Sequence, residues 1–251
     1  MLLEGQNAIV YGAGGAIGGA VARAFAGEGA RVHLAGRTLA RLERVAEEIR
    51  DAGGAVATAE LDALDERAVD EHADAVAARA GSVDISMNLI SIGDVQGTPL
   101  AEMAVGDFLQ PIVNLMRSAF LTARAAARHM IRQGSGVILM FGGDGDPVRD
   151  YHIGGFQIAL AAQESLRRQL ASELGRHGIR VLSLQTGGIP ETIPADFEGA
   201  EAIAKSLVDP TMLNRAATLA DVGHVAAFAA SDHARSMTAT ALNISCGAIV
   251  D

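Results

Sequence analysis

Apolar and polar residues alternate in blocks along the whole chain. Short, nearly continuous apolar runs predict strands buried on both faces, and longer stretches with apolar residues every three or four positions predict helices. Seven strands are expected on this basis, over residues 8–10, 31–34, 55–61, 83–90, 137–141, 179–184 and 241–244. Helices are expected between and after them, over residues 16–26, 39–49, 65–80, 107–131, 154–175, 195–207 and 219–230.

This regular order of strand and helix predicts an α/β fold. The expected architecture is a doubly wound, Rossmann-type parallel sheet of about seven strands with helices on both faces, and its ligand lies over the carboxyl ends of the strands. No linker divides the 251 residues, so one domain spanning 1–251 is expected. A small excursion near 188–210 is rich in proline and acidic residues, which suits either a lid over the substrate or a passive surface segment.

Composition narrows the possible partners. The net charge of −10 disfavours nucleic acid, and no uninterrupted apolar segment reaches the ~18 residues that a membrane span requires. Cys246 is the only cysteine, so neither an internal disulfide nor a thiolate metal cluster is expected, and a reducing cytoplasm fits. The histidines stand singly, without metal-like spacing, and a surface position is expected for His72, His129, His177, His224 and His233.

The glycine cluster after the first strand is the most informative motif. It reads Ala8-Ile-Val-Tyr-Gly-Ala-Gly-Gly-Ala-Ile-Gly18 and joins a buried strand to the start of a helix. Glycines there let the backbone approach a pyrophosphate, and the free N–H groups of the helix's first turn attract its negative charge. A glycine-rich surface turn is the alternative, but the strand-turn-helix context favours dinucleotide binding. The expected cofactor contacts here are Gly12, Gly14, Gly15, Ile17 and Gly18.

From about residue 5 to its end the chain resembles the short-chain dehydrogenase/reductases, in particular their 3-oxoacyl-ACP reductase-like members. Tyr11-Gly-Ala-Gly-Gly-Ala-Ile-Gly18 is similar to the family's Thr-Gly-x-x-x-Gly-x-Gly turn, with Ala16 in place of the middle glycine. Further similar segments are Leu61-Asp62-Ala63, Asn114, Gly175-Arg-His-Gly-Ile-Arg-Val181 and Asn243-Ile-Ser-Cys-Gly247. The resemblance implies a nicotinamide cofactor, and it implies a homodimer or homotetramer built through the long central helix and the helix after it. It adds these expected cofactor contacts: Asp62, Ala63, Asn88, Ile90, Gly187 and Gly188.

The end of the second strand indicates which nicotinamide cofactor is preferred. An acidic residue that pairs with a free ribose hydroxyl normally stands there, but Gly36 occupies the position and Arg37 follows it. A guanidinium at this place can bind a 2′-phosphate through forked, charge-assisted hydrogen bonds. The alternative is a solvated arginine at the start of a helix. The sequence therefore favours NADP(H) over NAD(H).

The catalytic positions of the family are altered in this chain. The resemblance implies a serine after the fifth strand and a Tyr-x-x-x-Lys in the next helix, where lysine lowers the pKa of the tyrosine. Gly143, Phe156 and Leu160 stand at those three positions. Asn88-Leu-Ile-Ser91 and Thr186-Gly187 also depart from the family's usual Asn-Asn-Ala-Gly and Pro-Gly. Ordinary acid-base reduction of a carbonyl is therefore not expected.

Candidate substitutes for the lost catalytic groups lie on the long helix and in the loop Asp144-Gly-Asp-Pro-Val-Arg-Asp-Tyr-His152. Tyr151 and His152 are the candidates from the loop, where His152 would share the face of Phe156 if the helix began early enough, and Asn114 is the candidate from the helix. The sequence predicts an NADP(H)-dependent oxidoreductase with an atypical, mainly apolar site for a small organic substrate and no metal. Two alternatives remain open. One is a catalytically silent nucleotide-binding member that senses, supports or pairs with an active relative, and the other is cofactor-assisted non-redox cyclisation or isomerisation.

Overall fold

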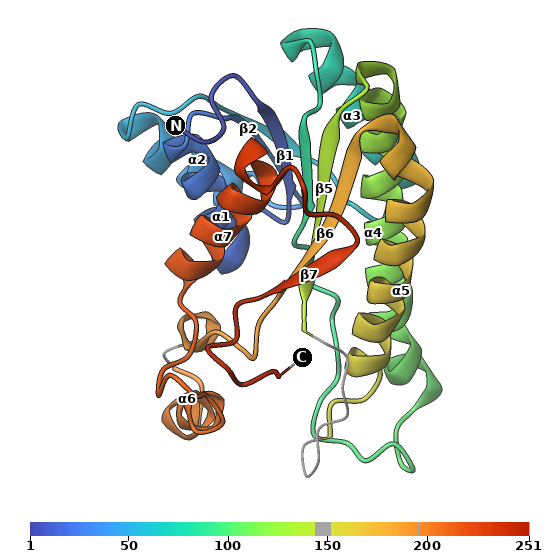
Figure 1. Cartoon of the computed structure of the whole chain (residues 1–251). Coiled ribbons are helices and arrows are strands. Elements are labelled where there is room, and N and C mark those ends of the chain that lie inside the picture. The colour runs from blue at the N-terminus through green and yellow to red at the C-terminus, as the bar shows by residue number, and fades with distance from the viewer. Residues whose placement is uncertain (144–151, 195, 251) are drawn as a thin grey trace.

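A single seven-stranded parallel sheet forms the centre of the molecule (Figure 1). The computed structural model describes residues 1–143, 152–194 and 196–250. The strands run in the order β3-β2-β1-β4-β5-β6-β7 and every neighbouring pair is parallel. They are β1 (Asn7–Tyr11), β2 (Arg31–Gly36), β3 (Val56–Glu60), β4 (Ile85–Asn88), β5 (Gly136–Gly142), β6 (Ile179–Gln185) and β7 (Thr240–Asn243). The predicted doubly wound fold is confirmed.

Helices cover both faces of the sheet. They are α1 (Ala16–Gly27), α2 (Leu39–Asp51), α3 (Glu66–Ala80), α4 (Val105–Gln133), α5 (Phe156–Leu174), α6 (Ala200–Val208) and α7 (Leu219–Ala230). Three short 3₁₀ turns are η1 (Gly175–His177), η2 (Pro190–Thr192) and η3 (Asp232–Ala234). In Figure 1, α1, α2 and α7 lie to the left of the sheet, and α3, α4 and α5 lie to the right. The order of the chain thus produces two helical layers around one sheet.

The alternation of side chains along β1 builds two hydrophobic cores. Val10 packs with Val21 and Phe25 of α1, whereas Ile9 and Tyr11 face the opposite layer of helices. All five of these side chains are fully buried. Because successive strand residues point to opposite faces, a strand covered on both sides must be apolar throughout, which explains the continuous apolar run in the sequence.

Several element boundaries differ by a few residues from the sequence prediction, and two of them have a clear local cause. Strand β4 ends at Asn88, where the Asn88 side-chain oxygen accepts a hydrogen bond from the Ile90 N–H at 3.1 Å and turns the chain. Helix α6 begins at Ala200 because Gly199, with φ of 83°, holds a left-handed conformation before it. Within the described part of the chain, no helix is both long and apolar enough to cross a membrane.

Two histidines expected on the surface pack against other side chains instead, His129 buried and His72 half-buried. His129 of α4 is only 7% exposed, and its Nε2 lies 2.8 Å from Asp74 Oδ1 while its Nδ1 lies 2.8 Å from an Arg132 nitrogen. His72 of α3 packs edge-on against the Tyr11 ring at 6.1 Å between centroids. His72 thus packs α3 on the sheet and His129 joins α4 to α3, which a helical pattern with isolated histidines does not reveal.

Candidate active site

The turn between β1 and α1 brings the backbone closest to the place where a dinucleotide would lie. Gly12 has a φ of 80°, and a Cβ atom added there would overlap the Leu89 carbonyl that follows β4. A Cβ added at Gly18 would overlap the Gly12 carbonyl. Glycine at both positions is therefore a geometric requirement of a turn packed this tightly.

The start of α1 is suited to an anion. Gly15 is the N-cap residue, no side chain caps the helix, and its first turn contains no acidic residue. The backbone N–H groups of Ala16 and Ile17 therefore begin the helix beside the glycine turn without a competing carboxylate. The methyl group of Ala16 is exposed, so the departure from the family's glycine costs no packing there. These residues fit the pyrophosphate of a dinucleotide.

The ends of β2 and β3 border the same turn. Arg37 is exposed directly after β2, and Arg41 in the first turn of α2 packs on Gly14: a Cβ added at Gly14 would lie 3.0 Å from the Arg41 Cβ. Glu60, exposed at the end of β3, is in register with Gly36 of β2. In-register neighbours of a parallel sheet point to the same face, so this carboxylate stands near the expected ribose position. Sequence reasoning missed both Arg41 and Glu60, since only strand register and helix docking place them.

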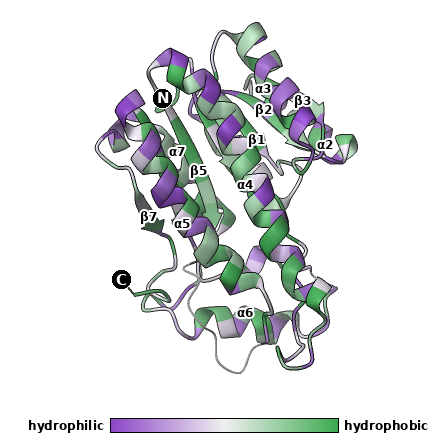
Figure 2. Cartoon of the chain, turned by 90° about the vertical axis from the view of Figure 1, so that its right-hand side faces the viewer, coloured by the Kyte–Doolittle hydropathy of each residue, from purple (hydrophilic) through white to green (hydrophobic). Residues whose placement is uncertain are grey.

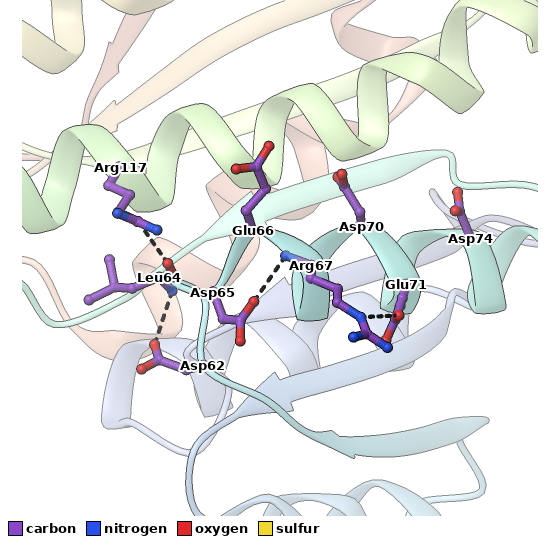
Figure 3. Close-up of a pocket in the computed structure, with 9 residues that line it drawn as sticks. All are labelled: Asp62, Leu64, Asp65, Glu66, Arg67, Asp70, Glu71, Asp74 and Arg117. Carbon is purple, nitrogen blue, oxygen red and sulfur yellow. Dashed lines mark hydrogen bonds and ion pairs between the residues drawn. The ribbon is translucent and has the colours of Figure 1, made fainter.

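The segment expected to contact adenine follows β3 directly. The Leu61 N–H donates to the Gly36 carbonyl at 3.0 Å, and Ala63 is 2% exposed. The Asp62 Oδ1 accepts a hydrogen bond from the Leu64 N–H at 3.0 Å. Asp62 also borders an open acidic groove of about 750 Å³ beside α3 and α4 (Figure 3). The groove is lined by Asp62, Leu64, Asp65, Glu66, Arg67, Asp70, Glu71, Asp74 and Arg117. The carboxylates make it unsuited to phosphate.

Behind the expected nicotinamide position, Asn88 ends β4 and is 6% exposed. Its Nδ2 donates a hydrogen bond to Ser118 Oγ at 3.1 Å, and its Oδ1 accepts one from the Ile90 N–H at 3.1 Å. On the next strands, the Thr186 N–H donates to the Gly142 carbonyl at 2.9 Å, so the ends of β5 and β6 stay together. The turn Asn88–Ile90 is thereby fixed as one wall of the site.

The opposite wall is formed by Gly187 and Gly188 after β6. A Cβ added at Gly187 would lie 2.9 Å from the Ala248 Cβ. Gly188 has a φ of 118°, and a Cβ there would lie 2.6 Å from a Leu207 methyl of α6. The close packing of Leu207 attaches α6, which belongs to the expected excursion at 188–210, to this wall of the site.

The three altered catalytic positions come together as an apolar cluster. Leu160 is 3% exposed, and its Cδ1 lies 3.3 Å from the place where Gly143 would carry a Cβ. Phe156 lies one turn earlier on α5 and packs against the same cluster. The cluster comprises Ile92, Leu115, Ala159 and Leu160, with Ile112 and Phe156 packed on it. None of these side chains can carry a proton between protein and substrate.

The polar side chains beside this cluster bind main-chain oxygens. Asn114 donates from Nδ2 to the Ile92 carbonyl at 3.0 Å. Gln163, 2% exposed and one turn after Leu160, donates from Nε2 to the Phe141 carbonyl at 3.2 Å. Gln163 was missed by sequence reasoning, although its spacing of three from Leu160 places it on the same face of α5. Asn114 thus supports the segment after β4, and Gln163 supports the end of β5.

The two loop candidates have different outcomes. Tyr151 lies outside the described residues, together with 144–150. His152 is exposed, and its carbonyl accepts the Gly97 N–H at 2.6 Å. Helix α5 begins at Phe156, so His152 precedes the helix by four residues and the early helix start that would align it with Phe156 does not occur. A catalytic role for either residue stays a prediction.

Beneath the glycine turn lies a buried polar cluster that the sequence did not suggest. Tyr11, His33 and His72 meet between the sheet and α3, and Tyr11 Oη, His33 Nε2 and His72 Nδ1 have no hydrogen-bond partner within the described residues. Burial lowers the pKa of His72 to about 4, with a smaller contribution from His33. Burial, and then the Asp70 carboxylate, raise the pKa of the Tyr11 phenol. The three groups are therefore neutral near pH 7.

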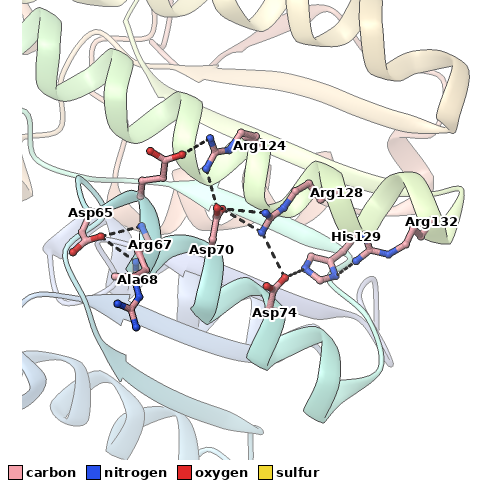
Figure 4. A network of polar contacts seen from close by, with 10 residues as sticks. Asp65, Arg67, Ala68, Asp70, Asp74, Arg124, Arg128, His129 and Arg132 are labelled. Atoms are coloured by element: carbon pink, nitrogen blue, oxygen red, sulfur yellow. Dashed lines mark hydrogen bonds and ion pairs between the residues drawn. The ribbon is translucent and has the colours of Figure 1, made fainter.

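A network of ion pairs adjoins this cluster and joins α3 to α4 (Figure 4). Asp70 forms ion pairs with Arg124 at 2.9 Å and with Arg128 at 3.2 Å, and Asp74 forms one with Arg128 at 3.5 Å. These contacts are partly exposed and contribute modestly to stability. Among the described residues, no group of three or more His, Cys, Asp or Glu side chains is placed to hold a metal ion.

The doubly wound parallel sheet and the glycine turn at its centre define a Rossmann-type, dinucleotide-binding protein. The chain belongs to the short-chain dehydrogenase/reductase superfamily: the family model described as enoyl-(acyl carrier protein) reductase matches residues 12–248. It is therefore an oxidoreductase of this type, in a family that binds nicotinamide cofactors.

Relatives differ widely in what they act on. D-threitol dehydrogenase of Mycolicibacterium smegmatis is 29% identical over 247 residues, covering 98% of this chain and 93% of the relative. The 7alpha-hydroxysteroid dehydrogenase of Escherichia coli is 27% identical, covering 98% of this chain and 95% of the relative. A short-chain type dehydrogenase/reductase structure from Mycobacterium ulcerans superposes with a TM-score of 0.91 at 25% identity, covering 99% of this chain and 91% of that one. A polyol enzyme and a steroid enzyme are thus about equally similar to this chain.

Proposed function

We propose that this protein is an NADP(H)-dependent oxidoreductase whose mainly apolar active site acts on a small organic substrate. The observation that carries the proposal is the packing of Leu160 against Gly142 and Gly143, with Phe156 in the same cluster. Apolar side chains there match an apolar part of a substrate and exclude water from the reacting carbon. The glycine turn and the wall Asn88–Ile90 support cofactor binding on the other side of the site.

The NADP(H) preference rests on Arg37. Its exposed guanidinium follows β2 where the ribose of a dinucleotide would lie, and neither Ala35 nor Gly36 provides a carboxylate. The other residues expected to contact the cofactor include Asp62 and Ala63, which would lie beside the adenine. When bound, the nicotinamide would supply or accept the hydride.

The residues of the chain would orient the substrate and deliver the proton. Phe156 and Leu160 hold no ionisable group, so the proton would come from water or from the loop 144–152 through Tyr151 or His152. Asn114 would act by holding the Ile92 carbonyl, and thereby the loop after β4, in place. The segment 188–210, with α6 against Gly188, would serve as the substrate lid within a single domain of residues 1–251.

We also propose a homodimer or homotetramer formed through α4 and α5. Figure 2 shows the two helices side by side, with hydrophobic positions along α4 turned outward. Val105, Leu109, Val113 and Phe120 of α4 are 74%, 44%, 54% and 46% exposed. They recur at helical spacing on one side, as expected for a helix that packs against a second copy. A cytoplasmic location, suggested by the single free cysteine Cys246, completes the proposal.

A screen of metabolites with NADPH oxidation as the readout tests the redox proposal. Once a substrate is found, Tyr151→Phe or His152→Ala is expected to lower its turnover while NADPH affinity stays within about twofold, because neither residue belongs to the nucleotide side. Arg37→Ala is the reciprocal control, expected to weaken NADPH and leave the chemical step intact.

A different outcome would favour the other candidate functions. The same apolar cluster also suits a silent nucleotide-binding member, or a pocket that folds a substrate for cyclisation or isomerisation. If no substrate consumes NADPH and the two loop variants leave the cellular phenotype unchanged while Arg37→Ala abolishes it, the redox proposal is wrong.

A further inference from the structure

The start of α2 lies directly on the glycine turn. Gly14 leaves only 3.0 Å between its missing Cβ and the Cβ of Arg41, so the Arg41 side chain starts from the surface of that turn. Thr38 is the N-cap of α2, its side chain makes no capping hydrogen bond, and the first turn has no acidic residue. Arg37 stands just before the cap. One short segment therefore carries two arginines, and the side chain of the second starts from the turn itself.

Neither arginine is engaged by an acidic partner. Other arginines near α2 form ion pairs, Arg23 with Glu48 at 2.7 Å and Arg50 with Glu43 at 3.1 Å. Arg37 and Arg41 are both exposed and form no ion pair with any residue that the structure describes. Neither side chain is therefore held elsewhere by a carboxylate of the described chain, and both are free to meet an anionic ligand.

The neighbouring acid explains why a single arginine would discriminate poorly. Glu60 is in register with Gly36 and points to the same face of the sheet, toward α2. A carboxylate on this face weakens the attraction that Arg37 alone would exert on a phosphate. A second guanidinium is needed for the site to attract a dianionic phosphate.

We infer that Arg41 is a second specificity-determining residue, which binds the 2′-phosphate of NADP(H) together with Arg37 beside the glycine turn. The inference rests on the proposed NADP(H) preference and deepens it. Phosphate can accept a forked hydrogen bond from each guanidinium, and two such donors fix its position better than one. Gly14 is required beside Arg41 because any larger side chain would displace the base of the arginine.

Titrations with NADPH, NADH, adenosine 2′,5′-bisphosphate and 5′-ADP test the inference without relying on turnover. Arg41→Ala is expected to weaken NADPH and the 2′,5′-bisphosphate about tenfold, the size of one charge-assisted hydrogen bond, while NADH and 5′-ADP change less than about twofold. Arg41→Lys should retain part of the affinity. The matched control is Arg44→Ala, which replaces an exposed arginine one turn nearer the middle of the same helix. This variant should leave the affinity for all four ligands unchanged. Thermal melts of each variant verify folding.

The outcomes separate this inference from the proposed function. If Arg37→Ala reduces the NADPH preference but Arg41→Ala behaves like Arg44→Ala, the inference is wrong and the cofactor proposal stands. If Arg41→Ala weakens NADPH and NADH equally, Arg41 only supports the turn and the inference is also wrong. If the unmodified protein binds NADPH and NADH with equal affinity, the cofactor proposal itself fails.

Discussion

The β1–α1 turn and the apolar cluster where the start of α5 meets the end of β5 stand at the same edge of one sheet, yet they serve the site in different ways. The first is determined by its backbone: Gly12 and Gly18 approach other main-chain atoms so closely that no Cβ fits. The second is determined by its side chains, among them the apolar side chains of Leu160 and Phe156. A backbone site tolerates a change such as Ala16, whereas proton transfer requires particular ionisable groups. Nucleotide binding and proton transfer can therefore be separated within one fold.

The largest expected effect comes from restoring the side-chain chemistry of the second region. The triple variant Gly143→Ser, Phe156→Tyr and Leu160→Lys is expected to reduce a β-ketoester about 10²–10⁴-fold faster than the unmodified protein. Single substitutions should do little because such groups act together. Gly143→Ser brings its Cβ to 3.3 Å from the Leu160 Cδ1, so the leucine side chain must shift slightly in the single variant. Initial rates of NADPH oxidation measure the gain.

Folding of that variant must be verified because Leu160→Lys buries an ammonium group. A melting curve serves for this, with Ser165→Ala, an exposed position on α5, as the control. A folded triple variant that binds NADPH and shows no gain in rate would mean that the altered positions have been misassigned.

The next effect concerns the first region. Gly12→Ala places a methyl group against the Leu89 carbonyl in a left-handed backbone conformation, so we expect a loss of about 3 kcal/mol in unfolding free energy and at least a ~10²-fold loss of NADPH affinity. Urea unfolding and fluorescence titration measure the two losses. Gly15→Ala in the same turn is the control, since its Cβ would lie an ordinary 3.4 Å from the Gly12 carbonyl. Equal effects of the two variants would show that close packing does not govern the turn.

A smaller effect is expected from acid, through the polar cluster beneath the turn. Burial holds the pKa of His72 at about 4, below its ordinary value of about 6.5, so the folded protein takes up the proton later than the unfolded chain. The associated stability is complete above pH 6.5 and decreases as the pH falls toward 4. Between pH 7.5 and 5.0 the expected loss is about 2 kcal/mol.

Urea unfolding across this pH range tests the role of His72. His72→Leu should flatten the acid limb of the stability curve, and His224→Ala, an exposed histidine on α7, should leave it unchanged. Superimposable acid limbs for His72→Leu and the unmodified protein would show that His72 does not control the acid response.

Prediction from sequence succeeded where a pattern has a direct physical cause. The seven strands follow from short apolar runs, and the tight turn follows from the glycines that it requires. It failed where position depends on docking. Glu60 stands beside Gly36 only because of strand register, and His33 and His72 meet only after α3 packs on the sheet. Leu160 was identified as a lost lysine position, but its contact with Gly143 needed three-dimensional coordinates.

The separation of the two regions is tested most directly on a single sample of the unmodified protein. NADPH fluorescence is titrated first, and a standard β-ketoester is then added at saturating NADPH. Saturable binding of NADPH is expected, with reduction of the ketoester indistinguishable from a protein-free control, because Gly143, Phe156 and Leu160 provide no proton donor. Turnover at ~1–10³ per second would contradict the assignment of the apolar region, and absence of NADPH binding would contradict that of the glycine turn.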